Sequence, residues 1–142
     1  MNNENIIRQI ETVKRNYLLE INSWTTIGAL ANKSGTIITN DKRVYNYTLF
    51  YNEEKASKEN AHSYFEEVYE LNPNQYQTFI NFINEENLIN QPYEKTDLQQ
   101  AGFNIYININ NNEKIIENCI SFDPNNPKIY DKLLLLIRNT LN

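Results

Sequence analysis

The stretch from Gly102 to Leu141 constrains the fold most, because it combines two strand patterns with a helix pattern. Apolar and polar residues alternate strictly over 103–110, the period of a strand with one buried face and one wet face. Three asparagines at 110–112 supply turn residues, and a second alternation runs through Ile116 and Ile120 to Phe122. The pattern predicts a β-hairpin that ends at the proline-containing segment 123–127.

A helix is predicted directly after this hairpin. Asn126 is a suitable N-cap and Pro127 fits a first helical turn. Apolar residues then recur every three or four positions, at Tyr130, Leu133, Leu134, Ile137 and Leu141. Core packing accounts for all of them, so the stretch is a scaffold and contains no reactive site.

The amino-terminal part also has helical spacing. Its apolar residues step by three or four, at Ile6, Ile10, Val13, Tyr17 and Ile21. They predict a helix from about Asn5 to Glu20 that packs on a sheet.

β-Branched and aromatic residues dominate 23–51 and predict two or three antiparallel strands, broken at Ser34-Gly35 and at Asn40-Asp41. On the last strand the odd residues 43–51 share one face and the even residues 44–50 share the other. Both faces hold aromatic residues. The strand is therefore either covered on both sides, or it reserves one face for a partner.

The acidic part of the chain is Asn52 to Glu70, with six glutamates and two lysines. Residues 53–60 resemble a loop. Ala61, Tyr64, Phe65 and Val68 fit a helical turn or two, although 68–71 fits a short strand equally well. Asn72-Pro73-Asn74-Gln75 has the form of a capping box and predicts a helix from Asn72 to Glu85.

These elements predict one α+β domain over residues 1–142. An antiparallel sheet of about four or five strands is expected with three helices: N-terminal, central and C-terminal. The polar segment from Asn84 to Gln100 reads as a connector. At 142 residues the chain suits a single domain.

Charge and composition narrow the function classes. The net charge of −5 disfavours nucleic acid and favours a basic protein surface. The single cysteine closes no internal disulfide. The first twenty residues resemble neither a signal nor an anchor, and no apolar run approaches the roughly 18 residues of a membrane span. These features predict a cytoplasmic location without membrane contact.

Residues with catalytic potential are sparse. His62, the only histidine, lies beside Ser63, with Glu66 one turn away if the segment is helical. Cys119 has no basic sequence neighbour to stabilise a thiolate. The interpretation is a surface histidine and a structural thiol, with no catalytic residue.

Cofactor sites lack their usual residues as well. One histidine and one cysteine far apart exclude the usual structural zinc site. Segment 123–126 offers oxygen ligands but lacks calcium-loop spacing, and Gly28, Gly35 and Gly102 are too isolated to form a phosphate loop. Adjacent glutamate pairs do not face one cleft. The sequence therefore predicts no metal and no cofactor, and it disfavours an enzyme.

Surface recognition is the remaining class. The acidic segment has negative charge that speeds encounter with a basic partner, and aromatic residues that serve as anchors. The predicted partner-binding residues are Glu53, Glu54, Glu66, Glu67, Glu70, Tyr64 and Tyr69. The competing interpretation is a solvated acidic surface whose aromatic residues face the core.

In general character the chain resembles the immunity proteins of bacterial toxin systems, including contact-dependent growth inhibition. The shared features are small size, acidity, one cysteine, the lack of a catalytic motif and the acidic aromatic segment of 52–70. The resemblance implies a cytoplasmic inhibitor that neutralises a cognate toxin domain, often a cationic nuclease.

Two other hypotheses stay open. The first is a structural or assembly module that forms a homodimer through the strand face of Tyr45, Tyr47 and Tyr51. The second is an enzyme centred on His62, which predicts a pocket that holds this residue beside a carboxylate.

Overall fold

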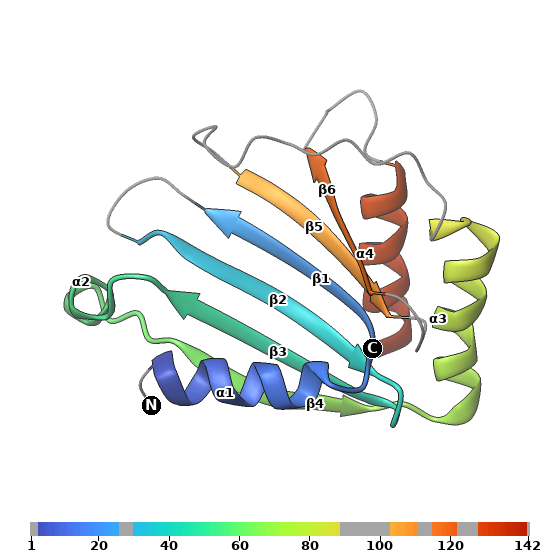
Figure 1. Cartoon of the computed structure of the whole chain (residues 1–142), viewed down its shortest axis with the longest axis horizontal. Coiled ribbons are helices and arrows are strands. Elements are labelled where there is room, and N and C mark those ends of the chain that lie inside the picture. Colours follow the sequence, from blue (N-terminus) through green and yellow to red (C-terminus); the bar gives the residue numbers. More distant parts are fainter. Residues whose placement is uncertain (1–2, 26–29, 89–102, 111–114, 122–127, 142) are drawn as a thin grey trace.

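A six-stranded antiparallel sheet runs through the computed structural model, which describes residues 3–25, 30–88, 103–110, 115–121 and 128–141. The strand order is β4-β3-β2-β1-β5-β6 (Figure 1). The elements are α1 (Asn3–Lys14), β1 (Tyr17–Thr25), β2 (Asn32–Thr39), β3 (Arg43–Phe50), α2 (Glu53–Lys58), β4 (Tyr64–Glu70), α3 (Pro73–Glu85), β5 (Phe103–Asn110), β6 (Ile115–Ser121) and α4 (Lys128–Leu141). The predicted α+β class is confirmed, and the sheet extends beyond the expected four or five strands.

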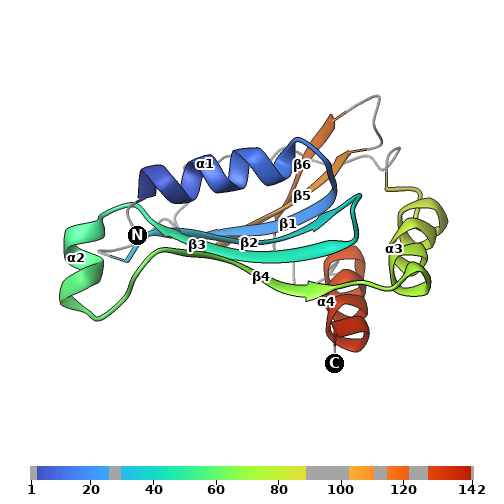
Figure 2. The same cartoon turned by 90° about the horizontal axis from the view of Figure 1, so that it is seen from below.

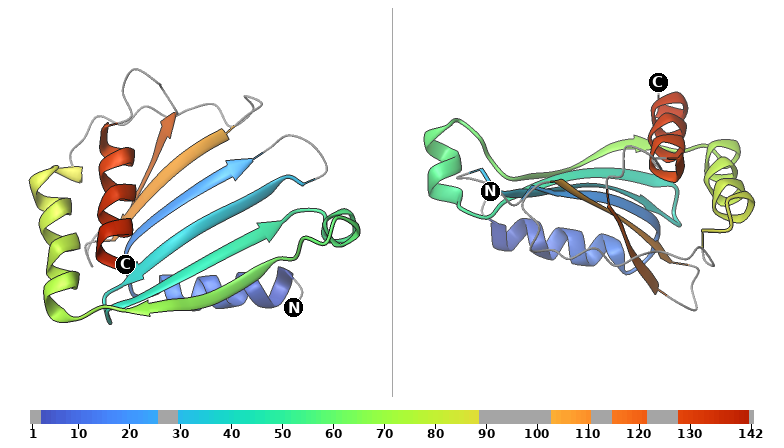
Figure 3. Two further views of the ribbon diagram at one scale, coloured as in Figure 1. Left: turned by 180° about the vertical axis from the view of Figure 1, so that it is seen from behind. Right: turned by 90° about the horizontal axis from the view of Figure 1, so that it is seen from above.

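The helices cover the two faces of the sheet unequally. α1 lies on one face, where Ile6 and Ile10 pack with Ile37 and Tyr47 (Figure 2). α3 and α4 pack at one end of the opposite face in a second cluster that includes Phe79. Seen from behind, no helix of the described residues covers the part of this face that lies toward α2 (Figure 3). We call this uncovered part the open face.

The N-terminal helix is shorter than predicted. α1 ends at Lys14, and Tyr17 and Ile21 belong to β1. β1 lies between β2 and β5 and pairs with both, for example through Leu19 with Ile38 and with Ile109. Two ladders satisfy its backbone groups, so pairing between distant segments prevails over the helical spacing of its apolar residues.

The predicted break at Ser34-Gly35 is wrong, whereas the break at Asn40-Asp41 is confirmed. Gly35 lies within β2 opposite Tyr47, and a Cβ atom there would be 2.6 Å from the Tyr47 ring. The glycine thus makes room for a buried ring in the middle of a strand. The actual turn uses Lys42 in the left-handed region at φ 67°.

The acidic segment differs most from the prediction. Residues 53–60 contain the helix α2, and the side chain of Asn52 caps it by accepting from the Lys55 N–H at 3.0 Å. The helical turn predicted around Tyr64 and Val68 is wrong. The alternative of a short strand at 68–71 is closer, because β4 runs from Tyr64 to Glu70 and pairs with β3.

The central helix is confirmed together with its capping box. Asn72 Oδ1 accepts from the Gln75 N–H, and Gln75 Oε1 accepts from the Asn72 N–H, both at 2.8 Å. The carboxy-terminal strand, strand and helix order is also confirmed, and Cys119 lies on β6 opposite Tyr106. The predicted turn at 111–112, the cap at 126–127 and most of the connector lie outside the described residues.

Candidate protein-interaction surface

Strand β4 brings most of the predicted partner-binding residues to one border of the sheet. It pairs with β3, and among the described strands it has no neighbour on its other side. Glu66, Glu67, Glu70, Tyr64 and Tyr69 lie on β4. Glu53 and Glu54 lie on α2, at the end of the sheet where β3 leads toward β4 (Figure 1). We call this border the β4 edge.

The strand period divides these residues between the two faces. Tyr64 lies opposite Thr48, and Glu66 lies opposite Asn46, so both are on the open face. Phe65 and Glu67 lie on the face that α1 covers, where Phe65 stacks on Tyr45 with ring centroids 5.3 Å apart. A partner that contacts both Glu66 and Glu67 must therefore approach the border itself.

Several of the acidic groups already have partners. Glu67 binds Arg43 at 2.5 Å, which raises the pKa of the guanidinium, and Glu54 binds Lys58 at 3.6 Å. Glu53 accepts the Asn3 N–H at 2.6 Å. No ion pair among the described residues includes Glu66 or Glu70, but the charge of Glu70 acts on Arg43 and helps to raise the pKa of its guanidinium. Glu66 is thus the carboxylate of the β4 edge best placed to meet an external cation.

The two predicted aromatic anchors differ in exposure. Tyr64 is 45% exposed and has the exposed Val68 on the same strand. Tyr69 is half-buried, packs against the core, and its hydroxyl accepts from Gln75 Nε2 at 3.0 Å. Tyr64 is available to a partner, whereas Tyr69 mainly joins β4 to α3.

Two hollows flank the β4 edge. On the open face a hollow of about 260 Å³ is lined largely by hydroxyl and amide side chains, and Tyr64 and Leu134 contribute to its walls. Four of its polar side chains pair with one another, Ser34 with Thr48 at 2.9 Å and Thr36 with Asn46 at 2.8 Å.

On the other face a hollow of about 240 Å³ lies between α1 and β4. We call it the α1 groove, and its lining residues are Arg8, Gln9, Thr12, Val13 and Phe65. The sequence does not predict this groove, because the helical interpretation of Phe65 does not place it on a strand beside α1. No signal in the sequence marks Arg8 or Gln9.

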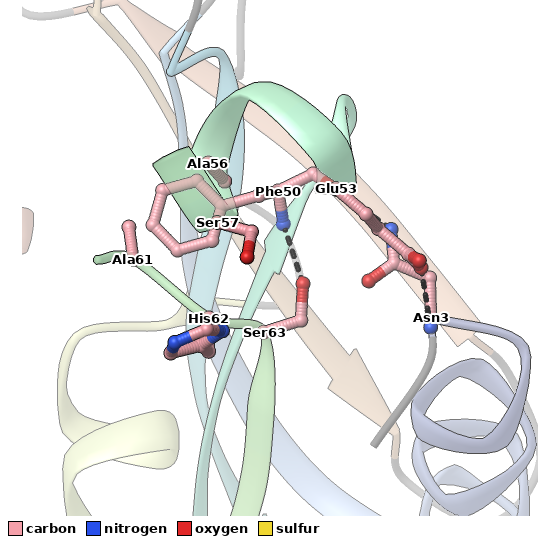
Figure 4. A pocket seen from close by; sticks show the side chains of 8 residues that line it. All are labelled: Asn3, Phe50, Glu53, Ala56, Ser57, Ala61, His62 and Ser63. Atoms are coloured by element: carbon pink, nitrogen blue, oxygen red, sulfur yellow. Dashed lines mark hydrogen bonds between the residues drawn. The ribbon is translucent and has the colours of Figure 1, made fainter. Parts of the chain in front are cut away.

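His62 lines a third pocket, of about 190 Å³, below α2 (Figure 4). Glu53 lines the same pocket, but its carboxylate is turned toward Asn3 and away from the imidazole. Ser63 Oγ accepts the Phe50 N–H at 2.9 Å and so fastens the start of β4 to β3. Because β4 is extended, Glu66 is not one helical turn from His62. The pocket contains histidine, serine and carboxylate groups, but they do not form a relay.

The aromatic strand face proposed for a homodimer is not a free surface. Tyr47 is 1% exposed beneath α1, and Tyr45 is packed in the same cluster. Burial is the main cause that raises the pKa of the Tyr45 hydroxyl, followed by the nearby Glu67. Tyr51 is exposed but follows the end of β3.

Glu20, the last residue of the predicted N-terminal helix, is instead a buried charge on β1. The Glu20 side chain is fully buried between α1 and the sheet, 2.7 Å from Lys14 Nζ. The Tyr47 hydroxyl donates to Glu20 at 2.5 Å, and burial, followed by the charge of Glu20, raises the pKa of Tyr47. This cluster fixes the end of α1 to β1 and β3, and thereby holds one wall of the α1 groove.

Within the described ranges, no three histidine, cysteine or acidic side chains gather in the way a metal ion requires. No helix in the same ranges has the length and apolarity needed to cross a membrane. A scan against protein-family models gives no match, and a search of curated proteins finds no relative of this chain.

Proposed function

We propose that the chain is a protein-binding inhibitor of the immunity-protein type, acting in the cytoplasm on a basic toxin domain such as a cationic nuclease. One observation carries the proposal: carboxylates and an exposed tyrosine lie along the same open border of the sheet. Glu66 supplies the negative charge and Tyr64 supplies the exposed aromatic ring.

The physical basis is charge complementarity around an aromatic anchor. Negative charge on the border attracts a basic surface and accelerates encounter, which makes association sensitive to salt. An exposed tyrosine supplies a large apolar contact with few rotatable bonds. A nuclease surface that binds phosphate is itself basic and complements this border.

The test starts with the toxin. The variable carboxy-terminal domain of a toxin-like protein encoded next to this chain is co-expressed with it, and survival of the host cells is scored. We expect the chain to rescue growth and to co-purify with that domain. Toxicity that persists despite soluble expression of both proteins would refute the inhibitor function.

The placement on the β4 edge is tested separately with matched variants. Glu66→Gln with Glu70→Gln should slow association roughly three- to tenfold at low ionic strength and flatten its salt dependence. Glu11→Gln with Glu85→Gln changes the net charge equally, at exposed positions on α1 and α3. Equal effects of the two pairs would mean that net charge, and not this border, attracts the partner.

A further inference from the structure

The outer side of β4 is a sheet edge that no other described strand occupies. Among the described strands only β3 pairs with β4, over a strand of seven residues. A strand with one neighbour presents backbone N–H and C=O groups on its other side, and these groups can pair with another extended chain.

The charge on this edge decides which chain can pair there. A second copy would bring glutamates against glutamates, and like charges across a strand pair are destabilising. Glu66 and Glu70 take part in no ion pair of the described residues. The charge of the edge therefore disfavours pairing with a second copy and favours pairing with an extended segment that contains basic residues.

The α1 groove sets a second, independent requirement for the side chains of a strand that pairs with β4. Side chains of a strand beside β4 would alternate between the two faces of the sheet. Those on the α1 side would meet the hollow of about 240 Å³ between Val13 and Phe65, which is large enough for an aliphatic side chain. Those on the open face would meet Glu66 and Tyr64.

We propose that the β4 edge binds an extended segment of a partner protein as an added strand, in which apolar and basic residues alternate. The apolar residues enter the α1 groove and the basic residues lie beside Glu66. The assignment of this segment to a toxin rests on the proposed function, whereas the mode of binding follows from the edge and the groove.

The probe is a phage-displayed library of random peptides, each roughly ten residues long, selected on the full chain. We expect the enriched peptides to alternate apolar and basic residues. A synthetic peptide with the enriched sequence should slow the hydrogen exchange of β4 amides, because the new ladder protects them.

Two variants and two controls locate the binding. Glu66→Lys should lower the affinity for the peptide at least about tenfold, because the new positive charge repels its basic residues. Gln9→Trp should lower the affinity to the same extent by filling the α1 groove. Glu85→Lys and Gln77→Trp make the same replacements at exposed positions on α3 and should leave affinity within about twofold. Circular dichroism checks that all four variants are folded.

Enrichment without alternation, protection at amides away from β4, or equal losses in variants and controls would overturn the proposal, as would no enrichment at all. The two proposals can fail separately. Edge binding without neutralisation of any toxin refutes only the inhibitor function. Neutralisation that withstands both Glu66→Lys and Gln9→Trp refutes only the added strand.

Discussion

Removal of the Lys14 charge should destabilise the protein more than removal of both Lys14 and Glu20. The Glu20 carboxylate is fully buried, with Lys14 Nζ 2.7 Å away and the Tyr47 hydroxyl at 2.5 Å. In Lys14→Met the methylene packing is largely kept, but a buried negative charge loses its cation. An uncompensated buried charge is costly, because it has lost its hydration.

The magnitude follows from this burial. Loss of one partner from a buried ion pair costs about 3–5 kcal/mol. The Lys14 side chain is 25% exposed, so water partly reaches the pair, and we expect the lower end, about 3 kcal/mol. Glu20→Gln keeps an oxygen that accepts from Tyr47 and should cost about 1–2 kcal/mol. The double variant should resemble Glu20→Gln and be more stable than Lys14→Met.

Urea denaturation of the four proteins at neutral pH measures the free energy of unfolding and completes a double-mutant cycle. In thermal scans, Lys14→Met should lower Tm by roughly 6–12 °C for a chain of this length. Additive losses in the double variant, or a Lys14→Met protein as stable as the parent, would refute the account of a buried carboxylate that depends on Lys14.

Two further predictions concern the same face of the sheet. Burial, and next the charge of Glu20, raise the pKa of Tyr47 in the folded state. The unfolded chain therefore releases this proton first once pH passes about 10, and this contribution to stability is intact below that pH and declines above it by roughly 1.4 kcal/mol per pH unit. Urea midpoints between pH 9 and 11 should fall less steeply in Tyr47→Phe, and equal slopes would contradict the prediction. Gly35→Ala should cost about 1–3 kcal/mol, because its Cβ atom would lie 2.6 Å from the buried Tyr47 ring. In a Tyr47→Leu background the loss should shrink, and an unchanged loss would rule out the ring as its cause.

Local signals in the sequence were sufficient where the stabilising contacts are themselves local. The α3 helix was predicted because its capping box joins residues three positions apart, Asn72 and Gln75. The hairpin of β5 and β6 was predicted because strict alternation and turn residues occur within a short stretch. Each of these signals can be read without knowledge of the rest of the chain.

Local patterns failed where distant segments compete for the same residues. Tyr17 and Ile21 continue the helical spacing of α1, yet pairing of β1 with β2 and β5 places them in the sheet. Tyr64 and Val68 also keep helical spacing, but both belong to strand β4, which pairs with β3. A short apolar run fits a helix and a strand equally well. Whether it forms a strand therefore depends on a neighbouring strand that can pair with it.

By itself the sequence determined the α+β class, the capping box of Asn72 and Gln75, and the acidic aromatic character of 52–70. Tertiary structure alone decided that this segment forms a sheet edge, that Glu66 and Glu67 lie on opposite faces, and that Glu20 is buried beside Lys14. The reason is that propensity and charge belong to individual residues, whereas edges, faces and burial are set by which distant segments pair and pack.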